Sequence, residues 1–446
     1  MKLKHISSAT SIIEAKDVKI LMDPWIEDGE YYGSWFHYPK INKDKINFAE
    51  VTHIYVSHIH PDHFSVKTFE ALNKSIPIYI HKYDAKFLKF NLERLGFNVF
   101  ELDNGISQKL SDSVNITIFA ADNCNPELCS KFIGCAPMEG KFKSTQIDSL
   151  AVISDGEYNI LNLNDCPFEL SNGAINAVMK KFKHIDLMLV GYCGAGPYPQ
   201  CFEMDQIAKN KAAEEKKLQF LNLGLKFINK IKPKYYMPFA GTYILGGSLS
   251  NLNDYRGIPE LDEALDYYSS NTTDIQSKGI LLNQNESFNL QNSIQSKEYE
   301  KVNIEEREYY INNVLKKVKY KYQQEEFITE DRILELLPEA FKRFEAKKNQ
   351  IGFKSKTLLF INISEKSDLL ISLNETSTYE IVSNNFYENS SSYVRISLDN
   401  RLLFKLLKGP RYAHWNNAEI GSHLTFKRYP NIFERGLYHC LYFLHL

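Results

Sequence analysis

Three histidines and an aspartate follow one another closely at the end of an apolar run. The stretch reads VSHIHPDHFS, and the side chains concerned are His58, His60, Asp62 and His63. Side chains alternate between the faces of a strand, so His58 and His60 can point the same way and bind one ion together. A turn through Pro61 brings Asp62 and His63 round to the same opening. Imidazoles and carboxylates are ligands for zinc, iron or manganese, and a carboxylate beside a metal can orient or deprotonate water. The pattern predicts a metal site with Asp62 as a catalytic residue.

The elements around this motif must hold it at the edge of a sheet. The run THIYVSH predicts a strand over 52–58, and SVKTFEALNK predicts a helix over 65–74. Further strand-like runs, among them IPIYIH, NVFEL, VNITIFAAD and HIDLMLVGY, recur along the first half of the chain with single helices between some of them. Strands followed by single helices indicate a layered α/β arrangement in which helices cover a sheet.

A lysine-rich amphipathic helix is predicted over 204–231, and Pro233 ends it. Its buried face is expected to carry leucine and isoleucine side chains at helical spacing, namely Leu218, Leu221, Leu225 and Ile228. Beyond GILLNQNESFNL the composition becomes richer in Glu, Lys, Ser and Asn. We therefore expect two domains, a catalytic domain over 1–295 and a smaller α+β accessory domain over 296–446.

Composition limits the kinds of partner. The 446 residues include 53 Lys and Arg against 55 Asp and Glu, and this balance does not favour nucleic acid or an anionic membrane surface. No apolar run is long enough to cross a bilayer, and the N-terminal stretch lacks the features of a secretory signal. Seven cysteines, an odd number, fit a reducing compartment. The expected location is the cytoplasm.

The His-X-His-X-Asp-His stretch after a strand resembles the signature of the metallo-β-lactamase superfamily. This resemblance implies a four-layered αββα fold with the metal site at the sheet edges. It also implies that His58 and His60 hold one divalent ion, zinc or iron, and that Asp62 and His63 hold a second.

Several longer segments resemble the CMP-N-acetylneuraminate hydroxylase family within that superfamily. They are DPWIEDGEYYGSWFHYP (23–39), HIYVSHIHPDHFS (53–65), YNILNLNDCPF (158–168), KPKYYMPFAG (232–241) and HWNNAEIGSHLTFKRYP (414–430). The family also carries an N-terminal Rieske iron–sulfur domain, whereas no Cys-X-His…Cys-X-X-His pair occurs in this sequence. The resemblance therefore implies the catalytic body without its electron-transfer module.

The remaining metal ligands are less regular. Asp165 follows the apolar run NILNLN, where the superfamily places a bridging carboxylate; the alternative is an aspartate that starts a turn before Pro167. The stretch FAADNCNPELC (119–129) occupies the place of the superfamily's third histidine, and the resemblance sets Asn125 at that position. Asp122 and Cys124 remain alternatives. These departures favour one ion, or an unusual pair, over a conventional two-zinc site.

Two further segments carry candidate site residues by resemblance. Phe239, in PFAG, stands where many superfamily members have their last histidine. The DPW…GSWFHYP segment lies near the active-site mouth in related folds, so His37 is a candidate catalytic residue and Trp35 a candidate substrate contact. The alternative for His37 is a histidine packed on aromatic rings.

The run GAGPYP (194–199) and the lysines that follow it suggest an anionic small-molecule substrate. Glycines permit close approach of the backbone, and lysines neutralise phosphate. Gly194, Tyr198 and Lys209 are the candidate contacts, and a solvated helix face is the alternative. Other lysines on the same helix share this possibility: Lys211, Lys216 and Lys217.

Two other groups of residues leave alternatives open. Four cysteines could form an iron–sulfur or zinc site, although their spacing matches no defined motif and buried thiols are the simpler interpretation. These are Cys124, Cys129, Cys135 and Cys166. Trp415, with Asn416 and Asn417, could contribute to substrate recognition or to domain packing.

The sequence supports three hypotheses about function. The first is a metal-dependent hydrolase that uses metal-activated water on a phosphoester or a nucleotide-sugar-like metabolite. The second is an iron-dependent oxygenase that takes electrons from a separate partner protein or from its substrate. The third is a non-catalytic descendant, which an intact His-X-His-X-Asp-His motif disfavours.

Overall fold

Two β-sheets face each other in the computed structural model, which describes residues 1–121 and 148–446. The first sheet contains, in spatial order, β17 (Ile294–Gln295), β16 (Ser287–Asn289), β1 (Lys2–Ser7), β2 (Thr10–Ala15), β3 (Val18–Met22), β5 (His53–Tyr55), β6 (Ile78–His81) and β7 (Val99–Leu102). The second contains β15 (Lys278–Gly279), β13 (Tyr235–Phe239), β12 (Leu187–Gly191), β11 (Asn159–Asn162), β10 (Ser149–Ser154), β9 (Asn115–Ala120) and β8 (Ser107–Lys109).

The inner faces of the two sheets form one core. Leu3 and Ile13 of the first sheet belong to the same buried cluster as Ile118 and Leu189 of the second. The central strands are covered on their outer faces as well, so they read in the sequence as continuous apolar runs and not as alternating patterns. Many of the runs that indicated strands in the sequence are such doubly covered strands.

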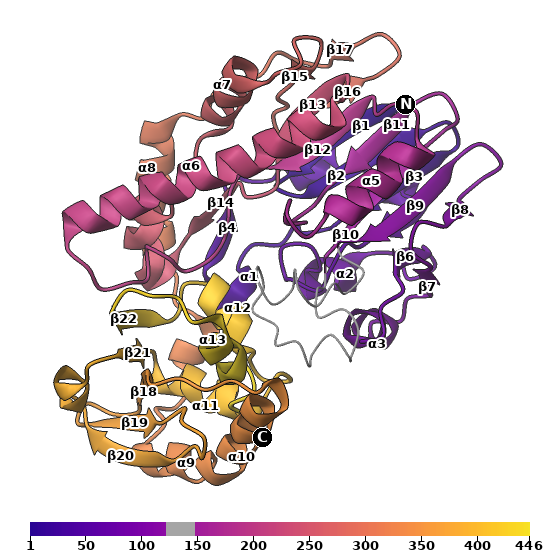
Figure 1. Cartoon of the computed structure of the whole chain (residues 1–446). Coiled ribbons are helices and arrows are strands. Elements are labelled where there is room, and N and C mark those ends of the chain that lie inside the picture. Colours follow the sequence, from indigo (N-terminus) through magenta and orange to yellow (C-terminus); the bar gives the residue numbers. More distant parts are fainter. Residues whose placement is uncertain (122–147) are drawn as a thin grey trace.

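Helices cover the outer face of each sheet (Figure 1). The first sheet packs against α2 (Val66–Ala71) and α3 (Phe87–Arg94). The second packs against α5 (Asn172–Lys181), α6 (Gln206–Ile231) and α7 (Leu261–Asn271). The layers therefore follow the order helix, sheet, sheet, helix, which confirms the expected αββα fold.

Helix α6 confirms the predicted lysine-rich helix but not its whole buried face. It begins where Asp205 accepts a hydrogen bond from the backbone N–H of Ala208, and it ends one residue before Lys232 turns left-handed. Leu218 is 42% exposed, so its predicted burial was wrong. The buried face instead centres on Gly224, where a Cβ would lie 2.0 Å from the hydroxyl of Tyr268 on α7. The predicted pattern thus holds at Leu221 and Ile228, which are buried, and fails at Leu218.

No helix among the described residues, α6 included, combines the length and the apolar character that crossing a bilayer requires.

A five-stranded sheet with its own buried core occupies the C-terminal part of the chain (Figure 1). Its strands, in order, are β20 (Tyr379–Ser383), β19 (Ser367–Ile371), β18 (Leu358–Asn362), β21 (Tyr393–Ser397) and β22 (Thr425–Tyr429). Its helices are α9 (Glu330–Leu334), α10 (Leu337–Ile351), α11 (Asn400–Lys408), α12 (Trp415–Ile420) and α13 (Arg435–Leu441). The expected α+β unit is present, and the boundary at 295 stays a prediction because α8 (Ile304–Asn313) packs on Phe36 and Ile244.

Backbone hydrogen bonds join this C-terminal unit to the rest of the molecule. The N–H of Phe426, on β22, donates to the carbonyl of Cys201, and the N–H of Glu203 donates to the carbonyl of Phe426, at 2.8 Å each. The segment around Phe202 therefore runs alongside β22. This contact sets α12 against α1 (Glu30–Gly33), beside the predicted metal motif.

Candidate metal centre

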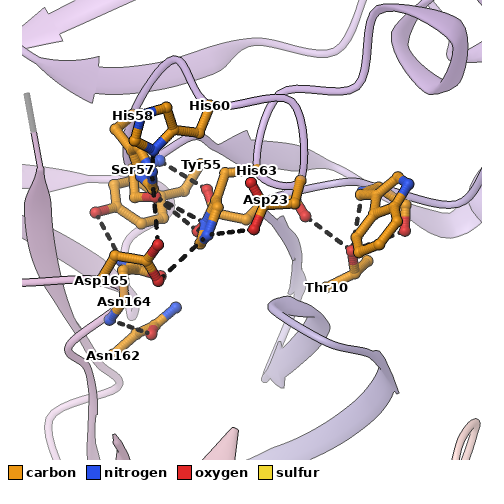
Figure 2. Close-up of polar contacts among 12 residues, drawn as sticks. Thr10, Asp23, Tyr55, Ser57, His58, His60, His63, Asn162, Asn164 and Asp165 are labelled. Carbon is orange, nitrogen blue, oxygen red and sulfur yellow. Dashed lines mark hydrogen bonds and ion pairs between the residues drawn. The ribbon is translucent and has the colours of Figure 1, made fainter. Parts of the chain in front are cut away.

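The candidate centre lies where several strands end at one edge of the two sheets. The motif of the three histidines follows β5, whose parallel neighbour β3 ends just before Asp23. Asp165 follows β11 in the facing sheet, and Asp148 precedes β10, which runs antiparallel to β11. Parallel strands end at a common edge, and the start of an antiparallel strand lies at that edge too. Polar side chains from both sheets consequently meet at one place (Figure 2).

One group of possible ligand atoms comes from His58, His60 and Asp165. The Nε2 atom of His58 lies 2.9 Å from Nδ1 of His60 and 3.8 Å from Oδ2 of Asp165. All three groups offer atoms within 4.8 Å of one another. Burial lowers the pKa of His58 well below its usual value, and burial also lowers the pKa of His60. Both imidazoles are therefore neutral near pH 7, the form that binds a metal.

A second group comes from Asp62, His63 and Asp165. The Nε2 atom of His63 lies 3.4 Å from Oδ1 of Asp165 and 3.5 Å from Oδ2 of Asp62. That nitrogen is buried and makes no hydrogen bond to any residue that the structure describes. Burial alone would lower the pKa of His63, but the surrounding carboxylates raise it well above its usual value. The position favours positive charge, which a bound cation provides.

Asp165 belongs to both groups and turns one oxygen to each (Figure 2). Burial would raise the pKa of Asp165, but the positive charge of His63 outweighs it and lowers that pKa below the usual value. A carboxylate ionised at neutral pH, with its two oxygens facing different imidazole groups, is suited to bridge two cations. The residues present thus fit a pair of divalent ions that share Asp165.

Asp23 fixes the histidine motif through buried hydrogen bonds. It is fully buried and accepts hydrogen bonds from the N–H and hydroxyl of Ser57, at 2.7 and 2.8 Å. Its Oδ2 also lies 2.9 Å from Nδ1 of His63. This contact fixes the Nδ1–H tautomer and leaves Nε2 directed to the centre, as carboxylates commonly do behind metal-binding histidines.

The C-terminal unit supplies the corresponding support for His60. Asn416, on α12 and 356 positions away along the chain, places its Oδ1 3.1 Å from Nε2 of His60. The other ring nitrogen of His60, Nδ1, faces Nε2 of His58. Trp415 on the same helix is buried and donates to the carbonyl of Leu444 at 3.0 Å, so it packs within the C-terminal unit.

A cavity of about 360 Å³ opens over the centre. Tyr31 lines it and donates a hydrogen bond to Oδ1 of Asp62. Trp35, on β4 (Trp35–His37), stacks on Tyr243 of β14 (Tyr243–Leu245) with ring centroids 3.4 Å apart. The lining includes the possible ligands His60, Asp62 and Asp165, and also Asp148, Cys166 and Gly194.

The predicted substrate contacts are divided between several places. Trp35 and Gly194 line this cavity, and a Cβ on Gly194 would lie 2.0 Å from the Phe220 ring. Phe239 is buried in the core between the sheets. His37 is also buried, with Nδ1 2.9 Å from Oδ1 of Asp28, and it is not among the residues that line the cavity.

The remaining predicted residues lie elsewhere. Lys209 donates to the carbonyl of Gln200 at 3.3 Å and does not line the cavity. Tyr198 lines a second cavity, described below. The positions predicted for a third ligand and for most of the cysteine group lie outside the described residues: Asn125, Cys124, Cys129 and Cys135.

Asp148 and Asp23 lie at the centre without having been singled out from the sequence, and Asn416 was named there only for substrate recognition or domain packing. Oδ1 of Asp148 lies 3.7 Å from Nε2 of His58, and its place just before the strand SLAVIS was a usable signal. Asp23 likewise follows the strand VKILM and could have been found by the same rule. Asn416 has no such signal, because its position depends on how two distant parts of the chain pack.

Two facing mixed sheets, helices on both outer faces and a His/Asp group at their common edge are the arrangement of metallo-β-lactamase-fold proteins, and this chain has that fold. No family model matches the sequence. The expected similarity to a CMP-N-acetylneuraminate hydroxylase is confirmed by the hydroxylase of Danio rerio, which is 26% identical over 255 residues. That match covers 54% of this chain and 38% of the hydroxylase.

A protein of Mycobacterium tuberculosis named "Putative Rieske 2Fe-2S iron-sulfur protein" is 28% identical over 262 residues, which cover 57% of this chain and 46% of that protein. The chain thus matches less than half the length of either relative. Among solved structures, an isothiocyanate hydrolase from Delia radicum gut bacteria gives a TM-score of 0.43 at 14% identity, covering 66% of this chain and all of that one.

Proposed function

We propose that this protein is a metal-dependent enzyme that binds two divalent ions at the edge of its two sheets. His58 and His60 would hold one ion, His63 and Asp62 the other, and Asp165 would bridge them. The single observation that carries the proposal is the placement of Asp165, with one carboxylate oxygen directed to each histidine group.

Bound iron or zinc would supply Lewis acidity, and iron would supply redox chemistry as well. Residues around the proposed ions position a metal ligand and limit the access of water. Tyr31 holds Asp62 through a hydrogen bond, which keeps one carboxylate oxygen engaged and the other turned to His63. The stacked rings of Trp35 and Tyr243 form an apolar side of the cavity, which limits access of bulk water to the substrate.

The reaction that we favour is the iron-dependent oxidation of a small polar substrate. Its support is that both curated relatives reported above carry names of redox proteins, one a Rieske iron–sulfur protein and one a hydroxylase. Histidines and carboxylates in mixed sets are suitable ligands for iron. Electrons would come from an iron–sulfur partner or from the substrate itself.

Hydrolysis by metal-activated water is the second candidate. The observation that favours it is the position of Asp62, a member of the second ligand group that also lines the cavity, where its carboxylate could orient a metal-activated water. The same His/Asp groups suit zinc.

Metal analysis and oxygen uptake of protein purified without added metal distinguish the two reactions. For the oxidation, we expect about two iron ions per chain and oxygen consumption on a polar metabolite in the presence of a reductant. Zinc alone, with phosphodiester hydrolysis that continues without oxygen, would exclude the oxidation and support the hydrolase. His60→Ala removes one of the proposed ligands, so this variant should lose both the metal and the activity.

A further inference from the structure

A second, larger cavity of about 600 Å³ lies between α6 and the C-terminal unit. Gly196 and Phe220 on one side and Ile420 on the other line both this cavity and the one over the metal centre. Asn416, whose Oδ1 contacts His60, also lines it. The two cavities are therefore adjoining parts of one space that leads from the metal centre into the contact between the two units.

A buried lysine faces this second cavity without a negatively charged partner. Lys216 on α6 is only 8% exposed, and its Nζ donates to the carbonyl of Gly196 at 3.0 Å. Within the described parts of the chain, no carboxylate lies within 4.0 Å of it. Burial lowers the pKa of Lys216 to about 8, so the amine is still mostly protonated at pH 7. A buried charge of this kind is unfavourable until an anion joins it.

A second cation faces the same space. The guanidinium of Arg428 lies over the ring of Phe202, 4.7 Å from its centroid, and within 5.9 Å of the centroids of Tyr198 and Phe433. It donates to Oδ1 of Asn431 and to the hydroxyl of Tyr438, which are both uncharged. Described carboxylates are absent within 4.0 Å of Arg428 too. The aromatic rings and neutral acceptors hold its charge in place without neutralising it.

The acidic side chains in the lining do not cancel these charges. Glu215 is exposed and lies 3.8 Å from Lys211. Glu419 is buried and accepts a hydrogen bond from Tyr442, and burial raises its pKa to about 7. At that pKa Glu419 is only partly ionised near pH 7, and the charge it keeps is near Arg435, which also lines the cavity. Lys216 and Arg428 therefore keep positive charges that neither of these glutamates pairs with.

We propose that this second cavity binds an oxyanion group of the substrate, a phosphate or a carboxylate, between Lys216 and Arg428. The neighbouring rings of Tyr198 and Phe433 would pack against an apolar or planar part next to that group. The rest of the ligand would extend past Gly196 to the metal centre, and this last step rests on the function proposed above. The substrate class is then an elongated, anionic small molecule that reacts at the end far from its charge.

Calorimetric titration of inorganic phosphate into the metal-loaded chain of 446 residues tests the site directly. Lys216→Met keeps an unbranched side chain as long as the aliphatic part of lysine and removes the charged amine, so we expect the fold to persist and phosphate affinity to fall at least about tenfold. Arg428→Gln should weaken binding similarly, and a thermal unfolding curve checks the fold of each variant. Lys211→Met, on the exposed side of α6, is the matched control and should bind as the wild type does. Acetate in place of phosphate shows which oxyanion the cavity prefers.

The variant Asp165→Asn, which is expected to lose the metal, distinguishes phosphate binding in the second cavity from phosphate binding to the metal. The proposal predicts that phosphate binding survives in Asp165→Asn and is lost in Lys216→Met. The reverse pattern, or no phosphate binding by the wild type, would overturn it. A wild-type chain that carries no metal but still binds phosphate through Lys216 would contradict the proposed enzyme function and support the cavity site.

Discussion

Replacement of Asp165 by asparagine is expected to remove both metal ions and to lower activity by more than about a hundredfold. The aspartate offers one oxygen to the pair His58 and His60 and the other to the pair His63 and Asp62. An asparagine has a single acceptor oxygen, and its NH₂ group would point a donor at one cation. One ion would then lose a ligand, and the other would keep a neutral amide oxygen in place of a carboxylate, so both would bind more weakly. Metal content per chain, measured by mass spectrometry, is the readout.

The matched control for this variant is Asp103→Asn. Asp103 is an exposed aspartate that pairs with Lys82 and belongs to neither ligand group, so its replacement should change neither metal content nor activity. Retention of two ions per chain by Asp165→Asn would show that the carboxylate does not bridge them.

Replacement of Asp23 by asparagine is expected to weaken metal binding by about 10- to 100-fold and to destabilise the protein by roughly 1–3 kcal/mol. The buried carboxylate accepts two hydrogen bonds from Ser57 and one from His63. An amide in its place leaves at least one of these donors without an acceptor and loosens the orientation of His63. Metal titration reports the first effect, and urea unfolding of the metal-free protein reports the second.

Asp28→Asn is the comparison for Asp23→Asn, because Asp28 also accepts from the Nδ1 of a histidine, His37, but outside the cavity lining. Its replacement should leave metal affinity unchanged. Equal losses of metal affinity in the two variants would mean that the Asp23 contact has no special part in holding the centre.

Local sequence pattern was sufficient for the layered fold and for the first ligand group. His58 and His60 come directly after a short strand that ends at Tyr55, so both lie at the sheet edge where that strand ends. Asp165 could be predicted for the same reason, since it follows an apolar strand of the facing sheet. These features depend on strand period and strand ends, which a single sequence displays.

Features that depend on packing between distant segments could not be predicted. The exposure of Leu218 could not be predicted from the helical pattern of α6, which groups Leu218 with the buried Leu221. The contact of Asn416 with His60, and the charge of Lys216 in a cavity between two units, exist only once the C-terminal unit is docked. Asn416 and Lys216 could be recognised in the sequence as candidate polar contacts, but their partners depend on how the chain folds.

The most direct test of a two-metal centre is an anomalous-scattering experiment on crystals of the native protein, with data collected at the iron and zinc absorption edges. If two ions share Asp165, we expect two peaks at one edge, one beside His58 and His60 and the other beside His63 and Asp62, with Asp165 between them. A single peak, or none near Asp165, would contradict it.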